Sequence, residues 1–369
     1  MSYPRLRATR PASIAWAAFA AIGCSAPSGG NGSSPSTTAS GPSTSSAPST
    51  SSAPGTSGAP GTSGAPGAGT TPGKSAGGST STGPSASASP TGSTSSSASS
   101  SSTRGADAAS APAGWVLTWA DEFDDPDGSA VDPTKWVHDV GGTGWGNQEL
   151  EYYTDGTQNA VLQGGSLVIT ATTDGASSQT CSYPSNGPCG YTSARLKTQG
   201  QFSQQYGRFE ARIQIPEGQG LWPAFWMLGA DIDTNSWPKC GEIDIMENIG
   251  KEPSINHGSL HMPAAGTSND SQLTGSYTLP GGAKLGDDFH TYAVEWSATE
   301  IRFYVDDNLY ETQSPSTATG RTWEFDKPFF IVLNVAVGGQ FPGSPNGATT
   351  FPQTMKVDYV RVYQPADGG

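Results

Sequence analysis

"CGEIDIMEN", residues 240–248, holds three acidic side chains, Glu242, Asp244 and Glu247, and no basic one. Successive side chains of a β-strand point to opposite faces, so Glu242 and Asp244 share one face and the two isoleucines share the other. The third acid comes one position late, because Met246 stands where this alternation requires the next acid. A β-bulge with Met246 as the extra residue would return Glu247 to the acidic face.

Three carboxylates within six residues repel one another, and no local base compensates them. Solvated acids on a half-exposed strand would explain "EIDI" alone. However, the preceding segment "GLWPAFWMLG" (220–229) adds two tryptophans and a phenylalanine. Carboxylates beside aromatic faces suit a sugar-binding site, and a pair of acids can hydrolyse a glycosidic bond. Retaining glycosidases hold the two carboxyls about 5–5.5 Å apart and inverting ones farther apart; we predict the retaining arrangement.

Short alternating or apolar segments recur from Trp115 onward, and Gly, Pro, Asn and Asp separate them. They are "GSLVITAT" (165–172), "GRFEARIQI" (207–215), "GEIDIMEN" (241–248), "HTYAVEWS" (290–297), "EIRFYVDD" (300–307), "FFIVLNVAV" (329–337) and "KVDYVRVYQ" (356–364). No long amphipathic helix stands out. This pattern predicts an all-β sandwich of antiparallel strands.

Charge limits the classes of partner. The 369 residues include 32 acids and 18 bases, for a net charge of −14. Nucleic acids and anionic membranes are bound through basic surfaces, so neither is expected as a partner.

The N-terminus is typical of an export signal. Three arginines precede the apolar run "PASIAWAAFAAIG" (11–23), which is too short for a permanent membrane span. The run ends at Cys24 in "AIGC", which resembles a bacterial lipobox, although Ala21 replaces the usual Leu. We predict a signal peptide over 1–24 and lipidation of Cys24, with an ordinary secretory signal as the alternative. Either interpretation predicts export, to the cell surface as a lipoprotein or to the extracellular medium.

Residues 25–113 are almost entirely Ser, Thr, Ala, Pro and Gly. Such a segment cannot bury enough apolar surface to offset the entropy of ordering it, so we predict a disordered tether. Its root-mean-square reach would be about 50 Å. The folded domain is then expected over 114–366.

The four cysteines divide into separate roles. Cys181 and Cys189 close the short loop "CSYPSNGPC", and a disulfide is expected there in an oxidising compartment. Cys240, beside the acids, is expected to be a buried packing residue.

The acidic strand and its surroundings resemble glycoside hydrolase family 16. "GEIDIMEN" matches the signature E-x-D-x-x-E in the bulged form that laminarinase-like members carry. The similarity covers about residues 115–365, through "WADEFD" (119–124), "WGNQELEYYT" (145–154), "YTSARLKTQGQF" (191–202), "YGRFEARIQIPEGQGLWPAFWMLG" (206–229), "GSLHMP" (258–263), "FHTYAVEWSATEIRFYVDD" (289–307), "LNVAVGGQFPG" (333–343) and "VDYVRVYQ" (357–364).

This resemblance implies a fold and three roles. The fold would be a concanavalin-like jelly-roll β-sandwich of two curved antiparallel sheets, with a cleft on the concave face. Glu242 would be the nucleophile, Glu247 the general acid/base and Asp244 the helper between them. Catalysis would need no cofactor or metal.

The resemblance also implies residues that bind sugars. Trp222 and Trp226 would shape the subsite next to the cut, although either could be a core residue. His261 would lie near the acid/base on the acceptor side, although a lone His is more often structural. The other candidates are Asn147, Glu149 and Arg195 for donor-side sugars, and Trp145 and Trp237 for the cleft rim. Arg195 could equally be a surface ion-pair residue.

Many members of the family carry one structural Ca²⁺ far from the chemistry. The matching positions here are Glu122 and Gly165, through backbone carbonyls, and Asp358.

We therefore expect a monomeric enzyme that cleaves internal β-1,3 linkages of a β-glucan polysaccharide and contacts a membrane only through the N-terminal anchor. The same mechanism on 1,3-1,4-β-glucan, β-galactan or agarose is the alternative. A noncatalytic lectin on the same sandwich is another, which the complete set of acids argues against.

Overall fold

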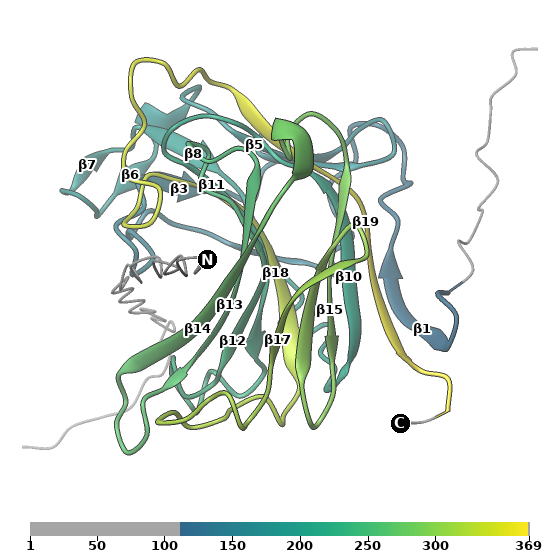
Figure 1. Cartoon of the computed structure of the whole chain (residues 1–369). Coiled ribbons are helices and arrows are strands. Elements are labelled where there is room, and N and C mark those ends of the chain that lie inside the picture. Colours follow the sequence, from purple (N-terminus) through teal and green to yellow (C-terminus); the bar gives the residue numbers. More distant parts are fainter. Residues whose placement is uncertain (1–110, 368–369) are drawn as a thin grey trace, which may run out of the picture. The chain divides into compact units, whose positions relative to one another are not determined.

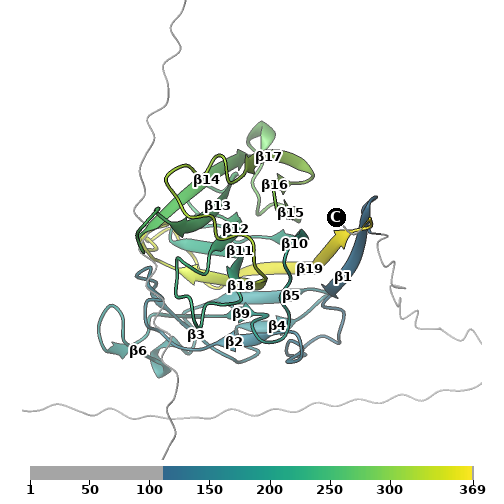
Figure 2. The ribbon, with the colours of Figure 1, turned by 90° about the horizontal axis from the view of Figure 1, so that it is seen from below.

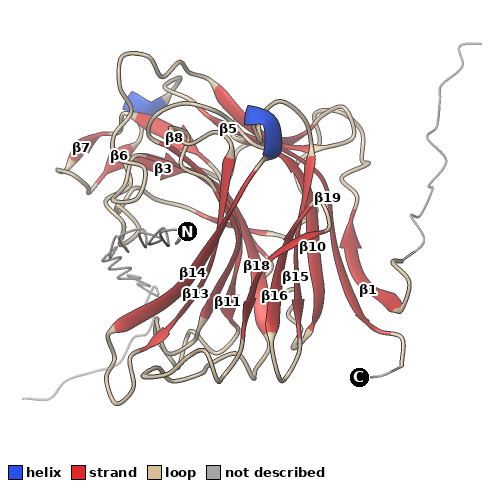
Figure 3. Ribbon diagram, viewed as in Figure 1, coloured by secondary structure: helices blue, strands red, loops and turns tan. Residues whose placement is uncertain are grey.

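The computed structural model describes residues 111–367 of the chain (Figure 1). The predicted signal peptide, the lipidation site at Cys24 and nearly all of the predicted tether lie outside these residues. The described residues form strands and two short 3₁₀ helices, η1 (Ala176–Ser178) and η2 (Pro280–Gly282) (Figure 3). Within this part of the chain, no helix is long and apolar enough to cross a membrane.

One layer is an eight-stranded antiparallel sheet. In spatial order its strands are β17 (Asn308–Gln313), β16 (Ile301–Val305), β15 (His290–Trp296), β10 (Gly207–Gln214), β19 (Gln353–Pro365), β5 (Leu167–Ala171) and β4 (Ala160–Leu162), while β1 (Trp115–Asp121) also pairs with β19. Strand β19 lies between β10 and β5 in this sheet, although the three strands are far apart in the sequence. Greek-key connections produce such neighbours.

The other layer is a seven-stranded antiparallel sheet. Its order is β14 (Asp270–Thr278), β13 (Ile255–Pro263), β12 (Glu242–Glu247), β11 (Leu221–Gly229), β18 (Phe329–Val337), β9 (Arg195–Lys197) and β2 (Val137–Asp139). Two small sheets complete the fold, one from β3 (Glu151–Tyr153) and β8 (Tyr191–Ser193), the other from β6 (Thr180–Cys181) and β7 (Gly187–Pro188). Figure 2 shows the two large sheets as curved layers, with β14 and β17 at the same edge.

The core lies between the two large sheets. Strand alternation turns Phe209, Ala211 and Ile213 of β10 inward, and each is fully buried. Leu333 and Val335 of β18 meet them from the other sheet in the same apolar cluster. Burying one such large apolar side chain stabilises the fold by about 1.5–3 kcal/mol. The opposite faces of the same strands are left for polar and aromatic residues.

The predicted jelly-roll is confirmed. Each of the seven segments predicted as strands contains one, namely β5, β10, β12, β15, β16, β18 and β19. Strand β14 was not predicted, because its sequence "DSQLTGSYT" has polar residues on both faces. It is an edge strand, paired only with β13 among the strands of its sheet, so it needs no fully apolar face.

Candidate active site

A β-bulge in β12 returns the third acid to the face of the other two. Asp244 pairs with Ser259 of β13, and Glu247 is paired with His257. Two residues of β12 therefore oppose one residue of β13, Gly258, which is the pattern of a bulge. The bulge expected from the late position of Glu247 is confirmed.

The prediction that Met246 is the extra residue is wrong. Met246 pairs with Phe225 of β11, and the next pair is Asp244 with Trp226, so Ile245 is the residue without a partner on β11. Ile245 and Met246 are both fully buried. Two successive side chains of the bulge turn toward the core, because each is apolar and the core lies on that side.

Gly258 allows the bulge to fit. A Cβ at this position would lie 2.9 Å from Cδ1 of Phe303 and would collide with the hydroxyl of Tyr310. Phe303 is fully buried in the apolar core and Tyr310 packs against it. The space opposite the bulge is therefore filled by the core and not by a side chain of β13.

The three acids line a cleft on the outer face of the seven-stranded sheet, together with every sugar-binding residue expected from the sequence. The lining consists of Trp145, Asn147, Glu149, Arg195, Trp222, Ala224, Trp226, Trp237, Glu242, Asp244, Glu247, Ile249, Glu252, His257, Ser259, His261, Gln272, Thr274, Asn334, Ala336, Gln340 and Phe341. Most of these side chains alternate with core residues along β9, β11, β12, β13, β14 and β18, so the sheet itself fixes their spacing.

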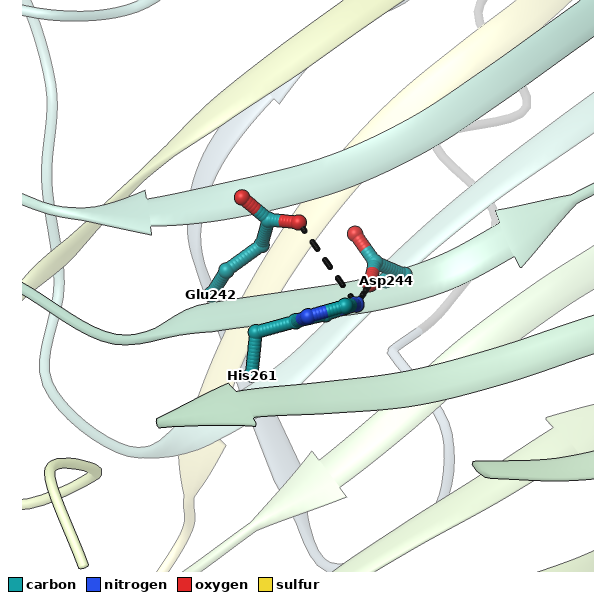
Figure 4. Close-up of side chains that lie close together, drawn as sticks. All are labelled: Glu242, Asp244 and His261. Atoms are coloured by element: carbon teal, nitrogen blue, oxygen red, sulfur yellow. Dashed lines mark ion pairs between the residues drawn. The ribbon is translucent and has the colours of Figure 1, made fainter. Parts of the chain in front are cut away.

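His261 lies beside two of the acids (Figure 4). Its Nε2 is 3.4 Å from Oδ2 of Asp244 and 3.9 Å from Oε1 of Glu242. Its Nδ1 is 2.9 Å from Oδ2 of Asp270, a residue of β14. His261 does lie on β13, on the side of β12 away from Arg195. The ring makes its ion-pair contacts with Asp244 and Glu242, and Glu242 is its partner in the strand register. Its charge also acts on Glu247, the expected acid/base.

Burial dominates the electrostatics of this group. It raises the pKa of Glu242 well above its usual value; Asp244 raises it further, and His261 opposes both. Burial likewise raises the pKa of Asp244, against the contact with His261. Burial lowers the pKa of His261, but Asp244, Asp270 and Glu242 outweigh it, and the pKa of His261 lies well above its usual value. The acids and the imidazole therefore titrate as one group.

Glu247 lies at the other end of the acidic face. Nε1 of Trp222 donates a 2.9 Å hydrogen bond to its Oε1. Burial raises the pKa of Glu247 to about 8, with a further contribution from Asp244, and the charge of His261 and the bond from Trp222 oppose the increase. Glu247 thus holds a proton at neutral pH.

Arg195 lies between two tryptophan rings of the cleft. Its guanidinium carbon is 5.1 Å from the ring centroid of Trp145 and 4.8 Å from that of Trp226. Its Nε is 3.0 Å from Oδ2 of Asp139, and Nε1 of Trp226 donates a 2.7 Å hydrogen bond to Oδ1 of Asn334. Stacking and the ion pair hold the guanidinium plane in one orientation. Arg195 is 8% exposed, which excludes the surface ion-pair alternative.

Glu149 belongs to a second group of buried acids. Asn147 donates to its Oε1 at 3.2 Å, and the hydroxyl of Tyr153 donates to its Oε2 at 2.9 Å. Burial raises the pKa of Glu149, whereas Glu151, Arg195 and these hydrogen bonds lower it. Burial raises the pKa of Glu151 well above its usual value, and Glu149 adds to the increase. Burial therefore disfavours the charged form of both acids, and the two titrate as a coupled pair.

Trp237 lies at the end of the cleft marked by Glu242. Its ring centroid is 5.9 Å from that of His261. It packs against a small apolar cluster with Leu228, Cys240 and Phe330. One face of the ring is thus supported by protein, and the residue remains a cleft-wall candidate as expected.

Several cleft residues were missed from the sequence. His257 and Phe341 meet edge to face, with centroids 5.3 Å apart, and Asp270 and Asp139 hold His261 and Arg195. Alternation from His261 back along "NHGSLHMP" could have found His257 and Ser259, which share its face. No local signal marks Asp270 or Asp139, because their partners lie on other strands.

The residues expected to bind calcium are engaged by arginines. Nε and Nη2 of Arg361 bind the carboxylate of Glu122 at 2.8 and 2.7 Å. Nη1 of Arg212 binds Oδ2 of Asp358 at 2.8 Å. The calcium prediction uses the backbone carbonyls of Glu122 and Gly165, which these ion pairs leave unused, and the carboxylate of Asp358, which Arg212 contacts through Oδ2. Carbonyl and carboxylate oxygens are the ligands that Ca²⁺ takes.

The three cysteines of the described residues occupy the expected environments. Cys181 and Cys189 form a disulfide with a Cα–Cα distance of 5.1 Å. Cys240 is a free, fully buried thiol. Burial raises the pKa of Cys240 to about 12, and the charge of Glu242 adds to the increase, so Cys240 is not a nucleophile.

Comparison with known proteins identifies the family of this chain. The profile of Glycosyl hydrolases family 16 matches residues 145–361. This chain belongs to glycosyl hydrolase family 16. The match spans the cleft from Trp145 to Phe341 and includes all three acids of β12, so the chain is a glycosidase of this family.

Relatives within glycosyl hydrolase family 16 cover the whole described domain. A protein of Rhodothermus marinus named beta-glucanase is 44% identical over 269 residues, which are 70% of this chain and 89% of that protein. The catalytic domain of a Thermotoga maritima laminarinase is 42% identical, with a TM-score of 0.61, over 68% of this chain and 98% of that one. An endo-beta-1,3-glucanase of Pyrococcus furiosus is 44% identical, also with a TM-score of 0.61, over 68% of this chain and 94% of that one.

Proposed function

We propose that this family 16 enzyme cleaves internal β-1,3 linkages of β-glucan by a retaining double displacement. The observation that carries the proposal is the bulged set of Glu242, Asp244 and Glu247 on one face of β12, inside a cleft walled by tryptophans. The three relatives named above, each a glucanase or laminarinase by name, support the substrate class.

The position of His261 divides the acids into two kinds. Its Nε2 lies within ion-pair distance of Glu242 and Asp244, whereas Glu247 has no such contact with it. A positive imidazolium favours the ionised form of the acids that it touches. Burial raises the pKa of all three acids, but Glu242 and Asp244 have the ion-pair contact that opposes this effect. We infer that negative charge concentrates on these two acids and that the proton remains on Glu247.

In the first step, the carboxylate of Glu242 attacks the anomeric carbon of the sugar on the donor side. Glu247 donates its proton to the glycosidic oxygen, and the bond from the anomeric carbon to that oxygen breaks. The products are an ester between the sugar and Glu242, and a released chain with a new hydroxyl. Asp244 lies between the two glutamates on the same face of β12, with Nε2 of His261 3.4 Å from its Oδ2.

In the second step, Glu247 is ionised and acts as a base. It removes a proton from a water molecule, the oxygen attacks the anomeric carbon, and the ester bond to Glu242 breaks. Glu242 returns as a carboxylate and Glu247 returns protonated. Two inversions at the same carbon give net retention of configuration.

Cleavage within a chain needs sugar contacts on both sides of the acids. On one side, Asn147, Glu149 and Arg195 offer an amide, a carboxylate and a guanidinium. On the other side, Gln272 and Thr274 of β14 line the same cleft. This arrangement supports endo cleavage of a polysaccharide.

A panel of polysaccharides tests the substrate. Reducing-end release from laminarin, lichenan, agarose and β-1,3-galactan should be largest with laminarin. A preference for lichenan would establish the 1,3-1,4-β-glucanase alternative. A solved structure that is 37% identical to this chain is described as a non-specific endo-beta-1,3(4)-glucanase, which is why lichenan is included. Release from agarose or galactan alone would replace the glucanase proposal. Binding of laminarin without any release would favour the lectin.

Proton NMR of freshly cleaved laminarin tests the mechanism. The first product should carry a β-configured reducing end, and the α-anomer should appear only by later mutarotation. An α-anomer as first product would require an inverting mechanism.

We also propose that catalysis needs no cofactor, and that a structural Ca²⁺ binds at Glu122, Gly165 and Asp358. Calcium should raise the melting temperature of the wild type after EGTA treatment, and should have little effect on Asp358→Asn. An equal gain in both would place the ion elsewhere.

Export, with lipidation of Cys24, completes the proposal, and the catalytic domain is expected to act as a monomer. Radiolabelled palmitate should enter the wild type expressed in bacteria and be absent from Cys24→Ser. Secretion of an unlabelled wild type would establish an ordinary signal peptide. Light scattering should give the mass of one chain.

A further inference from the structure

Both nitrogens of His261 face carboxylates. Oδ2 of Asp270 is 2.9 Å from Nδ1, and Oδ2 of Asp244 is 3.4 Å from Nε2, with Oε1 of Glu242 at 3.9 Å. The side chains of His261 and Asp270 are only 9% and 11% exposed. Little solvent therefore reaches the contact between His261 and Asp270.

This geometry suits one state of the imidazole. An ionised carboxylate only accepts hydrogen bonds, so a ring with a proton on each nitrogen fits carboxylates on both sides, with a hydrogen bond at Nδ1 and an ion-pair contact at Nε2. Among the described residues, Glu242, Asp244 and His261 are the one group of three with ligand atoms close enough for a metal ion. A doubly protonated ring has no lone pair for a metal, and the group is then an ion-pair network.

Asp270 reaches His261 from a different strand. It is the first residue of β14, where it pairs with Pro263, and Gln272 of β14 is the residue directly opposite His261. Asp270 therefore approaches diagonally, on the side of the ring away from the other acids. The diagonal neighbour on an antiparallel sheet is within reach of a long or aromatic side chain.

We propose that Asp270 is a positioning residue for the reaction: it holds His261 as an imidazolium beside Glu242, and so keeps the attacking carboxylate ionised in a cleft that otherwise disfavours charge. This inference rests on the proposed nucleophilic role of Glu242. Asp270 does not touch the substrate in this scheme and acts through His261.

The titratable groups near the imidazolium come from β12 and β14. Strand β12 contributes Glu242 and Asp244, with Glu247 farther along the same face, and β14 contributes Asp270. The thiol of Cys240 lies near Glu242 and stays neutral. Nη2 of Arg321 binds the carbonyl of Gln272 at 3.0 Å. Arg321 thus brings a positive charge to the backbone of β14 at Gln272, the residue that lies opposite His261.

Asp270→Asn tests the proposal. The amide oxygen can still accept from Nδ1, but the charge that holds the second proton on the ring is gone. His261 then becomes neutral at a lower pH, the pKa of Glu242 rises, and a higher pH is needed to ionise the nucleophile. The acid limb of the pH profile of kcat/KM on laminarin should move to higher pH by about one unit. At a given pH on that limb, kcat/KM should then fall about tenfold, while its value at the plateau changes less.

A second His–Asp pair supplies the control. His290 Nδ1 and Asp306 Oδ2 are 2.6 Å apart, and neither residue lines the cleft. Asp306→Asn makes the same chemical change and should leave the pH profile unmoved. Asp270→Glu retains the charge and should restore the wild-type acid limb more fully than Asn does.

Nitrogen-15 NMR of the imidazole gives a readout independent of activity. The wild-type His261 ring should show two protonated nitrogens at neutral pH, and the Asp270→Asn ring one. A neutral ring in the wild type overturns the proposal even if Asp270→Asn fails to fold. An equal loss of kcat/KM at every pH also overturns it, because that is the signature of a structural role. Failure of the proposed function is separate, and would be seen as a wild type that releases no sugar.

Discussion

The indole N–H of Trp222 donates a 2.9 Å hydrogen bond to Oε1 of Glu247. Trp222 lies on β11 and Glu247 on β12, and the bulge is what turns the carboxyl toward this donor. A donor to a carboxylate favours its ionised form, so the bond limits how far burial raises the pKa of Glu247. The same tryptophan that forms a wall of the cleft therefore adjusts the group that donates the proton.

Trp222→Phe should move the alkaline limb of kcat/KM to higher pH. The variant loses the N–H donor, the ionised form of Glu247 is less favoured, and the acid keeps its proton to a higher pH. Trp226→Phe is the matched control, since its indole donates to Asn334 instead. Equal shifts in both variants would show that the effect comes from lost packing.

Glu242→Gln should abolish hydrolysis and retain glucan binding. The amide preserves shape and hydrogen bonding but cannot form the glycosyl ester. The rate should fall at least about a hundredfold, or about 2.7 kcal/mol of barrier, as measured by reducing-end release and by calorimetric binding of laminarin. Activity within tenfold of the wild type would remove Glu242 from the nucleophilic role.

Glu247→Gln should lose general-acid help, and its effect should depend on the leaving group. Substrates with an activated aryl leaving group need less protonation, so they should be cleaved much faster than laminarin. Azide should partly rescue the variant, because it attacks the glycosyl ester without needing a base. Glu217 is a half-buried acid outside the cleft that pairs with Lys284, and Glu217→Gln should behave as the wild type does.

Deletion of one bulge residue, Ile245, should preserve the fold and slow the reaction. An unbulged strand is a permitted pairing, but Glu247 would change its height and tilt, and catalysis is sensitive to displacements near 1 Å. We expect at least about a tenfold loss of kcat, or about 1.4 kcal/mol, with circular dichroism unchanged. Full activity would mean that the bulge is incidental to the chemistry.

Glu151→Gln should change how stability depends on pH. The folded-state pKa of Glu151 is raised, so the protonated acid contributes stability that is present below the unfolded pKa and is lost as pH rises through the folded pKa. The variant should melt near the wild-type temperature in acid and above it in alkali. A constant difference between the two melting curves at every pH would contradict the coupled titration with Glu149.

Much of the fold was predictable because most of its long strands have a recognisable pattern of apolar and polar residues in the sequence. In β10 and β12, apolar and polar residues alternate, and this alternation follows directly from a sheet with one buried face. Strand β14 carried no such signal, since an edge strand gains its place from pairing with β13. The bulge was predictable from the late position of Glu247, but its unpaired residue was not. Ile245 and Met246 are both apolar, and only the register against β11 distinguishes them.

The sequence by itself determined that three acids share one face of a strand, that aromatic residues accompany them and that the domain is a β-sandwich. These are local properties, set by spacing along one strand. Only the tertiary structure decided which charges meet: Asp270 with His261, Asp139 with Arg195, and Trp222 with Glu247. Each of these contacts joins different strands, and its partner is chosen by sheet register and strand order. The protonation of the acids depends on those contacts and on burial. The acids could therefore be identified from the sequence, but their charge states depend on the tertiary structure.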